Sequence, residues 1–159
     1  MDAQRRSEIA ERGRKLLPEL HRAVVDSWPD LLPAAATWSP QSARRARRAA
    51  LAALEGILRA IEQGDVSDRA WKWLRDEVFV HEKGGDDTEQ LVRSVRVVGV
   101  ETLAGSLAAT IGLSHDERWQ LQREASGFCE ALLGIHEELD PAAYDALLAE
   151  LQRSGPDLR

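Results

Sequence analysis

The stretch that decides the fold runs His81-Glu-Lys-Gly-Gly-Asp-Asp-Thr-Glu-Gln-Leu-Val-Arg-Ser-Val-Arg-Val-Val-Gly-Val-Glu-Thr-Leu103. The two glycines near its start are typical of a helix end, and the acidic pair after them complements the positive end of a new helix's dipole. From about Asp87 to Ile111, apolar residues then cover a wide arc at helical spacing, which is typical of a central, buried helix. The stretch therefore predicts a helical domain built around this one long helix.

Working outward, helical spacing of apolar residues continues over almost the whole chain, and no segment alternates long enough to predict a strand. Pro18 should kink or divide the first helix, and Ser39 is a suitable N-cap for the second. Ser114 and Glu117, three residues apart, form a capping box for the fifth. The predicted helices span about residues 7–26, 40–63, 67–84, 87–111, 115–139 and 141–154.

These elements predict an all-α fold, a single-domain bundle of about six helices over residues 1–159 with its core at about 7–153. A globin-like arrangement is one form that such a bundle can take. On the central helix, small residues should let neighbouring helices approach closely. They are Gly99, Ala104, Gly105, Ala108 and Ala109.

Composition narrows the classes of function. The 159 residues carry a net charge of −6, and residues 81–159 hold 7 Lys and Arg against 15 Asp and Glu, which disfavours direct nucleic-acid binding by this chain. No apolar run is long enough for a membrane span, and the N-terminus lacks a secretory signal, so we expect a cytoplasmic protein. The single cysteine, Cys129, lies in an apolar segment and is expected to be buried.

A candidate dimer interface follows the fifth helix. Its apolar residues alternate steps of four and three, a coiled-coil-like seam suited to a nearly parallel partner helix. The pattern is the same whether that partner belongs to the same chain or to a second copy. The seam residues are Leu121, Ala125, Phe128, Leu132 and Ile135.

A candidate ligand site lies on the central helix, where Arg93 and Arg96 are three residues apart and share one side. If that side faces the interior, each guanidinium needs a carboxylate from Glu89, Glu101 or the fifth helix, because an unpaired buried charge is very costly. A bound anion is the alternative. His81, near a predicted helix end, is the candidate axial ligand if the protein is instead a haem or tetrapyrrole binder.

Other features have ordinary structural interpretations. The four histidines form no zinc-like spacing, so neither a metal nor a resident cofactor is predicted. Four arginines at the start of the second helix are expected to be solvated or paired with acidic surface. They are Arg44, Arg45, Arg47 and Arg48. Trp28, Trp38 and Trp119 lie near helix ends or in the connector, where packing under loops is usual. Since no nucleophile or di-iron motif occurs in the sequence, we do not expect an enzyme, and a small helical enzyme is kept only as a further alternative.

The segment from Gly85 to Leu107 resembles the all-helical N-terminal domains of PucR/CdaR-type bacterial transcriptional regulators. It is more distantly similar to the sensor domain of RsbR-type stressosome proteins. The order Leu91, Arg96, Gly99 carries the likeness. Residues 51–64 fit the preceding part of the pattern and residues 130–138 fit its closing helix, so the likeness covers most of residues 7–139.

This resemblance implies a bundle akin to a globin without haem, which serves as a sensory or dimerising module. Such domains usually precede a central domain and a C-terminal helix-turn-helix, and this chain shows neither. We therefore expect a homodimeric regulatory module, either part of a longer regulator or a free-standing relative, that responds to a small-molecule effector or a protein partner.

Overall fold

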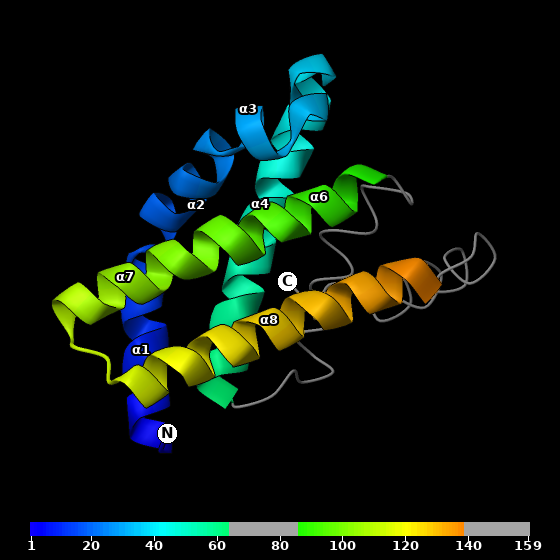
Figure 1. The fold of residues 1–159 in the computed structure, drawn as a ribbon. Helices are drawn as coiled ribbons and strands as arrows, with labels where there is room; N and C mark the ends of the chain where they lie inside the picture. Colours follow the sequence, from blue (N-terminus) through cyan, green and yellow to red (C-terminus); the bar gives the residue numbers. More distant parts are fainter. Residues whose placement is uncertain (64–85, 139–159) are drawn as a thin grey trace, which may run out of the picture.

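The computed structural model describes residues 1–63 and 86–138. Within these ranges the chain forms packed helices and no strand, so the predicted all-α bundle is confirmed. In chain order the elements are α1 (Ala3–Lys15), α2 (Leu17–Asp26), α3 (Trp28–Leu31), the 3-10 helix η1 (Pro33–Thr37), α4 (Pro40–Gln63), α6 (Asp86–Ser94), the π-helical segment η2 (Val95–Gly99), α7 (Val100–Thr110) and α8 (His115–Glu138) (Figure 1). The helices predicted for residues 67–84 and 141–154 lie outside the described residues.

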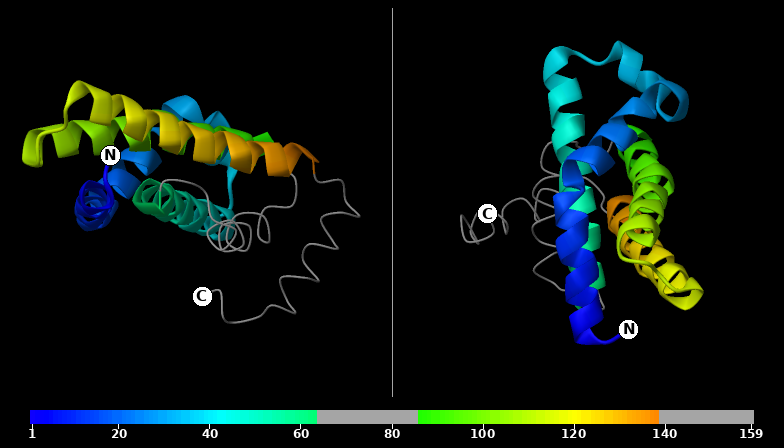
Figure 2. Two further views of the ribbon diagram at one scale, coloured as in Figure 1. Left: turned by 90° about the horizontal axis from the view of Figure 1, so that it is seen from below. Right: turned by 90° about the vertical axis from the view of Figure 1, so that its left-hand side faces the viewer.

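The described helices form two crossing layers (Figures 1 and 2). The central helix, made of α6, η2 and α7, lies beside α8 in one layer, and α1 and α4 lie beneath them in the other. Helix α4 packs against α1, α2 and α8, and its buried face is rich in alanine, so its neighbours reach its backbone closely. None of the described helices combines the length with the apolar composition that crossing a bilayer needs.

Local signals set the helix ends as expected. The first predicted helix divides into α1 and α2, with Pro18 in the first turn of α2, where a missing N–H breaks no helical bond. It also begins earlier than predicted, because the Asp2 carboxylate accepts a hydrogen bond from the Arg5 N–H at 2.8 Å and caps α1. At the start of α4, the Ser39 hydroxyl accepts a hydrogen bond from the backbone N–H of Ser42 at 3.1 Å.

The central helix runs without a break from Asp86 to Thr110, which confirms the helix predicted for residues 87–111. Two residues after its end, Gly112 has a φ of 66°, the left-handed conformation that favours glycine. The η2 segment was not predicted: here the hydrogen bonds widen to the π pattern, which inserts one residue into the α-helical ladder.

Close packing around the central helix occurs at Gly99 but not at Gly105. A β-carbon at Gly99 would lie 2.8 Å from Leu54 Cδ2 and 3.3 Å from Val24 Cγ2, so α2 and α4 approach the helix there because the residue is glycine. A β-carbon at Gly105 would meet nothing within 4 Å. The expectation that the small residues serve internal packing therefore holds for Gly99 and is wrong for Gly105.

One buried polar network joins the central helix to α3. The Ser94 side chain is fully buried at the last residue of α6; its hydroxyl donates to the Leu91 carbonyl at 2.6 Å and accepts from Trp28 Nε1 at 3.0 Å. Trp28 in turn packs edge-on against Trp38, with 5.7 Å between ring centroids. Trp28 is buried and Trp38 is half-buried, which agrees with the expected packing of the connector. The Trp28 indole N–H has an acceptor, without which its burial would be costly.

Replacing Ser94 with alanine should lower the free energy of unfolding by about 1–3 kcal/mol, because the buried Trp28 N–H would lose its acceptor. Urea unfolding followed by circular dichroism measures this change. Thr110→Ala removes a similar hydroxyl-to-carbonyl bond at an exposed position and should cost less than about 0.5 kcal/mol. Equal losses for the two variants would contradict the role assigned to the buried bond.

Candidate functional site

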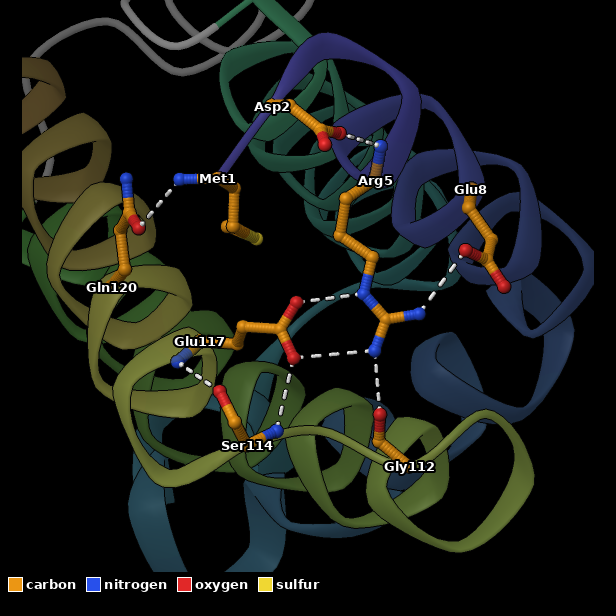
Figure 3. Close-up of polar contacts among 8 residues, drawn as sticks. All are labelled: Met1, Asp2, Arg5, Glu8, Gly112, Ser114, Glu117 and Gln120. Carbon is orange, nitrogen blue, oxygen red and sulfur yellow. Dashed lines mark hydrogen bonds and ion pairs between the residues drawn. The ribbon is translucent and has the colours of Figure 1, made fainter.

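The polar surface of α1 meets the turn between α7 and α8 in a cluster centred on Arg5 (Figure 3). Arg5 donates from Nε to one Glu117 carboxylate oxygen at 2.7 Å and from Nη2 to the other at 3.2 Å. The same guanidinium pairs with Glu8 at 3.1 Å and donates to the Gly112 carbonyl at the end of the central helix. One side chain therefore links α1, the turn and α8.

The capping box predicted at the start of α8 is present and forms part of this cluster. The Glu117 N–H donates to the Ser114 hydroxyl at 3.1 Å, and the Ser114 N–H donates to the Glu117 carboxylate at 3.0 Å. Hydrogen bonds from Arg5, followed by those from Ser114, hold the pKa of Glu117 at about 2. The carboxylate is thus ionised at neutral pH, a state suited to an ion pair and unsuited to proton transfer.

Two further arginines of α1 make double hydrogen bonds with carboxylates on neighbouring helices. Arg6 reaches Glu124 on α8 at 2.7 and 2.9 Å, and it also donates to the Ile61 carbonyl of α4 at 2.8 Å. Arg14 reaches Glu62 on α4 with two contacts of 3.0 Å, which lower the pKa of that carboxyl. Because both oxygens of each carboxylate are engaged, these pairs fix the position of α1 against α4 and α8.

The structure does not bring the predicted ligand residues into a pocket. Arg93 is exposed on α6 and donates to Glu89 at 3.3 Å, one of the partners expected for it. Arg96 is half-buried on η2, close enough for its charge to act on the Cys129 thiol. The two side chains thus lie in different surroundings, and His81 lies outside the described residues.

The predicted dimer seam on α8 packs inside the chain. Leu121, Ala125, Phe128 and Leu132 are each 0% exposed and belong to the apolar core formed with the other helices. Of the two arrangements that the pattern allowed, the structure has the one within a single chain, so these four side chains offer no surface to a second copy. The side chain of Ile135 lies outside the described part.

An apolar space lies among Leu20, Leu54, Ile57, Leu58, Gly99, Val100 and Leu103. Its volume is about 180 Å³ including open solvent, with no room for a water molecule, whereas ligand pockets typically measure about 300–1,000 Å³. No group of three or more potential metal-ligating side chains occurs among the described residues.

The outward face of α8 carries a feature that the sequence interpretation missed. Trp119 is 57% exposed, so its predicted packing under a loop is wrong, and Arg123 one turn later lies over its ring at 5.3 Å. The signal was available, because Trp119 precedes the buried Leu121 by two residues and so leaves the helix on the opposite side. Val97 and Leu31 are also exposed, at 46% and 43%. The four arginines of residues 44–48 are exposed on α4, which agrees with the expectation that they lie on the surface.

Acid should weaken the α1–α8 contact in a defined pH range. Glu117 has a pKa of about 2 when folded against an ordinary value of 4.5, so its pair stabilises the fold above about pH 4.5 and loses this contribution as the pH falls toward 2. Glu117→Gln should therefore be less stable than the original protein at pH 7, and the difference should shrink toward zero near pH 2. Urea unfolding across this range measures it. Glu8→Gln, which removes only an exposed pair within α1, is the control; a pH-independent gap for Glu117→Gln would refute the prediction.

The Cys129 thiol should be unreactive in the folded protein. Its side chain is fully buried, and burial raises its pKa to about 12, an effect larger than the opposing one of Arg96. A colorimetric disulfide reagent at pH 8 should label the native chain only as fast as it opens, and the urea-unfolded chain at once. Rapid labelling of the native chain would contradict the burial of this helix face.

No family model, curated protein or solved structure matches this chain in the three comparisons made. The likeness to PucR/CdaR-type and RsbR-type domains accordingly stays a prediction from residues 7–139.

Proposed function

We propose that this chain is a cytoplasmic regulatory module of a bacterial signalling or transcription-control protein, which acts by dimerising and by binding a partner rather than by catalysis. The observation that carries the proposal is the exposed Trp119 with Arg123 stacked over it on the outward face of α8. Trp and Arg are the residue types that most often supply the binding energy of protein interfaces.

The exposure of Trp119 contrasts with the treatment of apolar side chains elsewhere in the bundle. Phe128 and Leu121, on the same helix, are completely buried. A tryptophan left more than half exposed gives up hydrophobic stabilisation, and a protein contact that covers the ring regains it. We therefore assign the surface around Trp119 to protein binding.

The connections of α8 make it a suitable element for receiving a signal. Arg5 and Arg6 tie its first three turns to α1, and its inner face packs against α4 and the central helix. The π-helical segment η2 lies in that central helix, and such segments occur frequently at functional sites. In this proposal, a partner binds α8 and acts through it on the central helix, which packs against α8 and contains η2.

Dimerisation is the first expectation to test. Native mass spectrometry and sedimentation velocity on the purified full chain should show a reversible dimer whose fraction rises with concentration through the micromolar range. The mass spectrum also reveals any bound compound: a dimer of bare mass supports action through protein contacts. A strict monomer up to hundreds of micromolar would overturn the proposal.

A further inference from the structure

We infer that the outward face of α8 pairs with the same face of a second copy, with the two helices antiparallel and a two-fold axis between Ser126 and Gly127. In this contact, Arg123 of each copy faces Glu130 of the partner subunit. The inference rests on the proposed dimerisation and names the surface responsible for it. The occupant is a second copy of this chain because the face is complementary to itself.

Four exposed residues on α8 define this face: Trp119, Arg123, Gly127 and Glu130. They are separated by four, four and three residues, so they lie along one side of the helix. That side is opposite to the buried seam, whose side chains are fully covered by the chain's own core. Helix α8 thus has one side packed in the bundle and another side available to a partner.

Gly127 has no packing explanation among the described residues. A β-carbon there would meet nothing within 4 Å, whereas at Gly99 it would lie 2.8 Å from Leu54. Glycine weakens a helix in which it occupies an interior position. A helix from a second copy that crosses at Gly127 would explain the glycine, because the absence of a side chain lets two backbones approach closely.

The charges around Gly127 distinguish it from Gly105, which is equally exposed and equally open. Arg123 and Glu130 lie on either side of Gly127, and the midpoint between them falls between residues 126 and 127. An antiparallel partner centred there forms the Arg123–Glu130 pair twice, once on each side of the axis. Around Gly105, the only charged residue between positions 97 and 113 is Glu101, so a second copy centred there would offer no opposite charge to pair with it.

The same charges select the direction of the partner helix. A parallel pairing in register would place Arg123 beside Arg123 and Glu130 beside Glu130, and like charges across an interface oppose association. The antiparallel pairing replaces both repulsions with attractions. Trp119 lies at each end of the contact, where the partner helix covers part of its exposed ring.

The size of this face determines how strongly the two copies should bind each other. From Trp119 to Glu130 the helix extends about 16 Å, which is short for a protein interface, so we expect a reversible dimer with a dissociation constant of micromolar order. Residues of this face make no long-range ion pair within the described chain, and a substitution there should leave the bundle intact.

Charge reversal provides the decisive test. Sedimentation velocity on the full chain should show that Arg123→Glu and Glu130→Arg each weaken dimerisation about tenfold or more. The double variant R123E/E130R should return the dissociation constant to within about threefold of the original, because it restores both pairs with reversed sign. Two weakened single variants without recovery in the double variant would overturn the antiparallel pairing.

A second pair of variants tests the crossing point. Gly127→Leu should abolish the dimer because its side chain would fill the space where the two helices cross. Gly105→Leu is the matched control: this glycine is equally open but lies on α7, so its replacement should leave the dimer unchanged. Circular dichroism and thermal melting check that both variants fold. If Gly127→Leu does not fold, the charge-reversal variants still test the antiparallel pairing.

The outcomes separate this inference from the proposed function. A wild-type dimer that none of the α8 variants weakens overturns the inference and leaves the proposed dimerising module in place, with its interface elsewhere. A wild-type chain that stays monomeric overturns both. A wild-type chain that associates beyond the dimer also contradicts the inference, because a two-fold contact closes after two copies.

Discussion

The contact between η2 and helices α2 and α4 at Gly99 governs how the described helices fit together. Leu54 from α4 and Val24 from α2 occupy the space that a side chain at this position would need. Because side chains of α2 and α4 lie directly against the η2 backbone here, the helices pack closely around this point, and the core includes residues from every long helix described. The π-helical turn ends at this same glycine, so the local irregularity and the closest approach coincide.

Charged groups on α1 complement this apolar packing without entering the core. Arg5, Arg6 and Arg14 each find a carboxylate on another helix, although the chain as a whole is acidic. Partly exposed pairs of this kind contribute less free energy than burial of the core, but their double hydrogen bonds fix direction. The apolar core determines that the helices pack, while these pairs determine the position of α1 along α8 and α4.

Much of the fold could be predicted because its signals are local. Pro18, Ser39 and the Ser114–Glu117 box act within one helical turn, so a short window of sequence contains all that is needed to place a helix end. The π segment could not be predicted, since Val95 to Gly99 reads as ordinary helix until the packing of α2 and α4 is known. The contact of Arg5 with Glu117 joins residues far apart in sequence and depends on the completed fold.

The seam of α8 shows a second limit of prediction from sequence, and this limit concerns the surface through which the protein functions. Steps of four and three residues say that one side of a helix is buried, but they carry no information on which chain buries it. Once the structure places Leu121 and Phe128 in the core, the opposite side of the helix becomes the side available for association. That side was not visible as an interface in the pattern because it is mixed: one aromatic ring, two opposite charges and a glycine.

Trp119 also differs from the other exposed apolar residues because its ring has a side-chain contact within its own helix. Val97 and Leu31 are single exposed side chains of a kind found on most protein surfaces. The Trp119 ring instead lies under the Arg123 guanidinium at 5.3 Å, a contact that favours this arrangement of the two side chains. Side chains ordered in advance lose less conformational entropy on binding, so even a short face can support association. The stacked pair therefore gives this side of α8 what an isolated apolar residue lacks, an aromatic surface and a charge already placed for a partner.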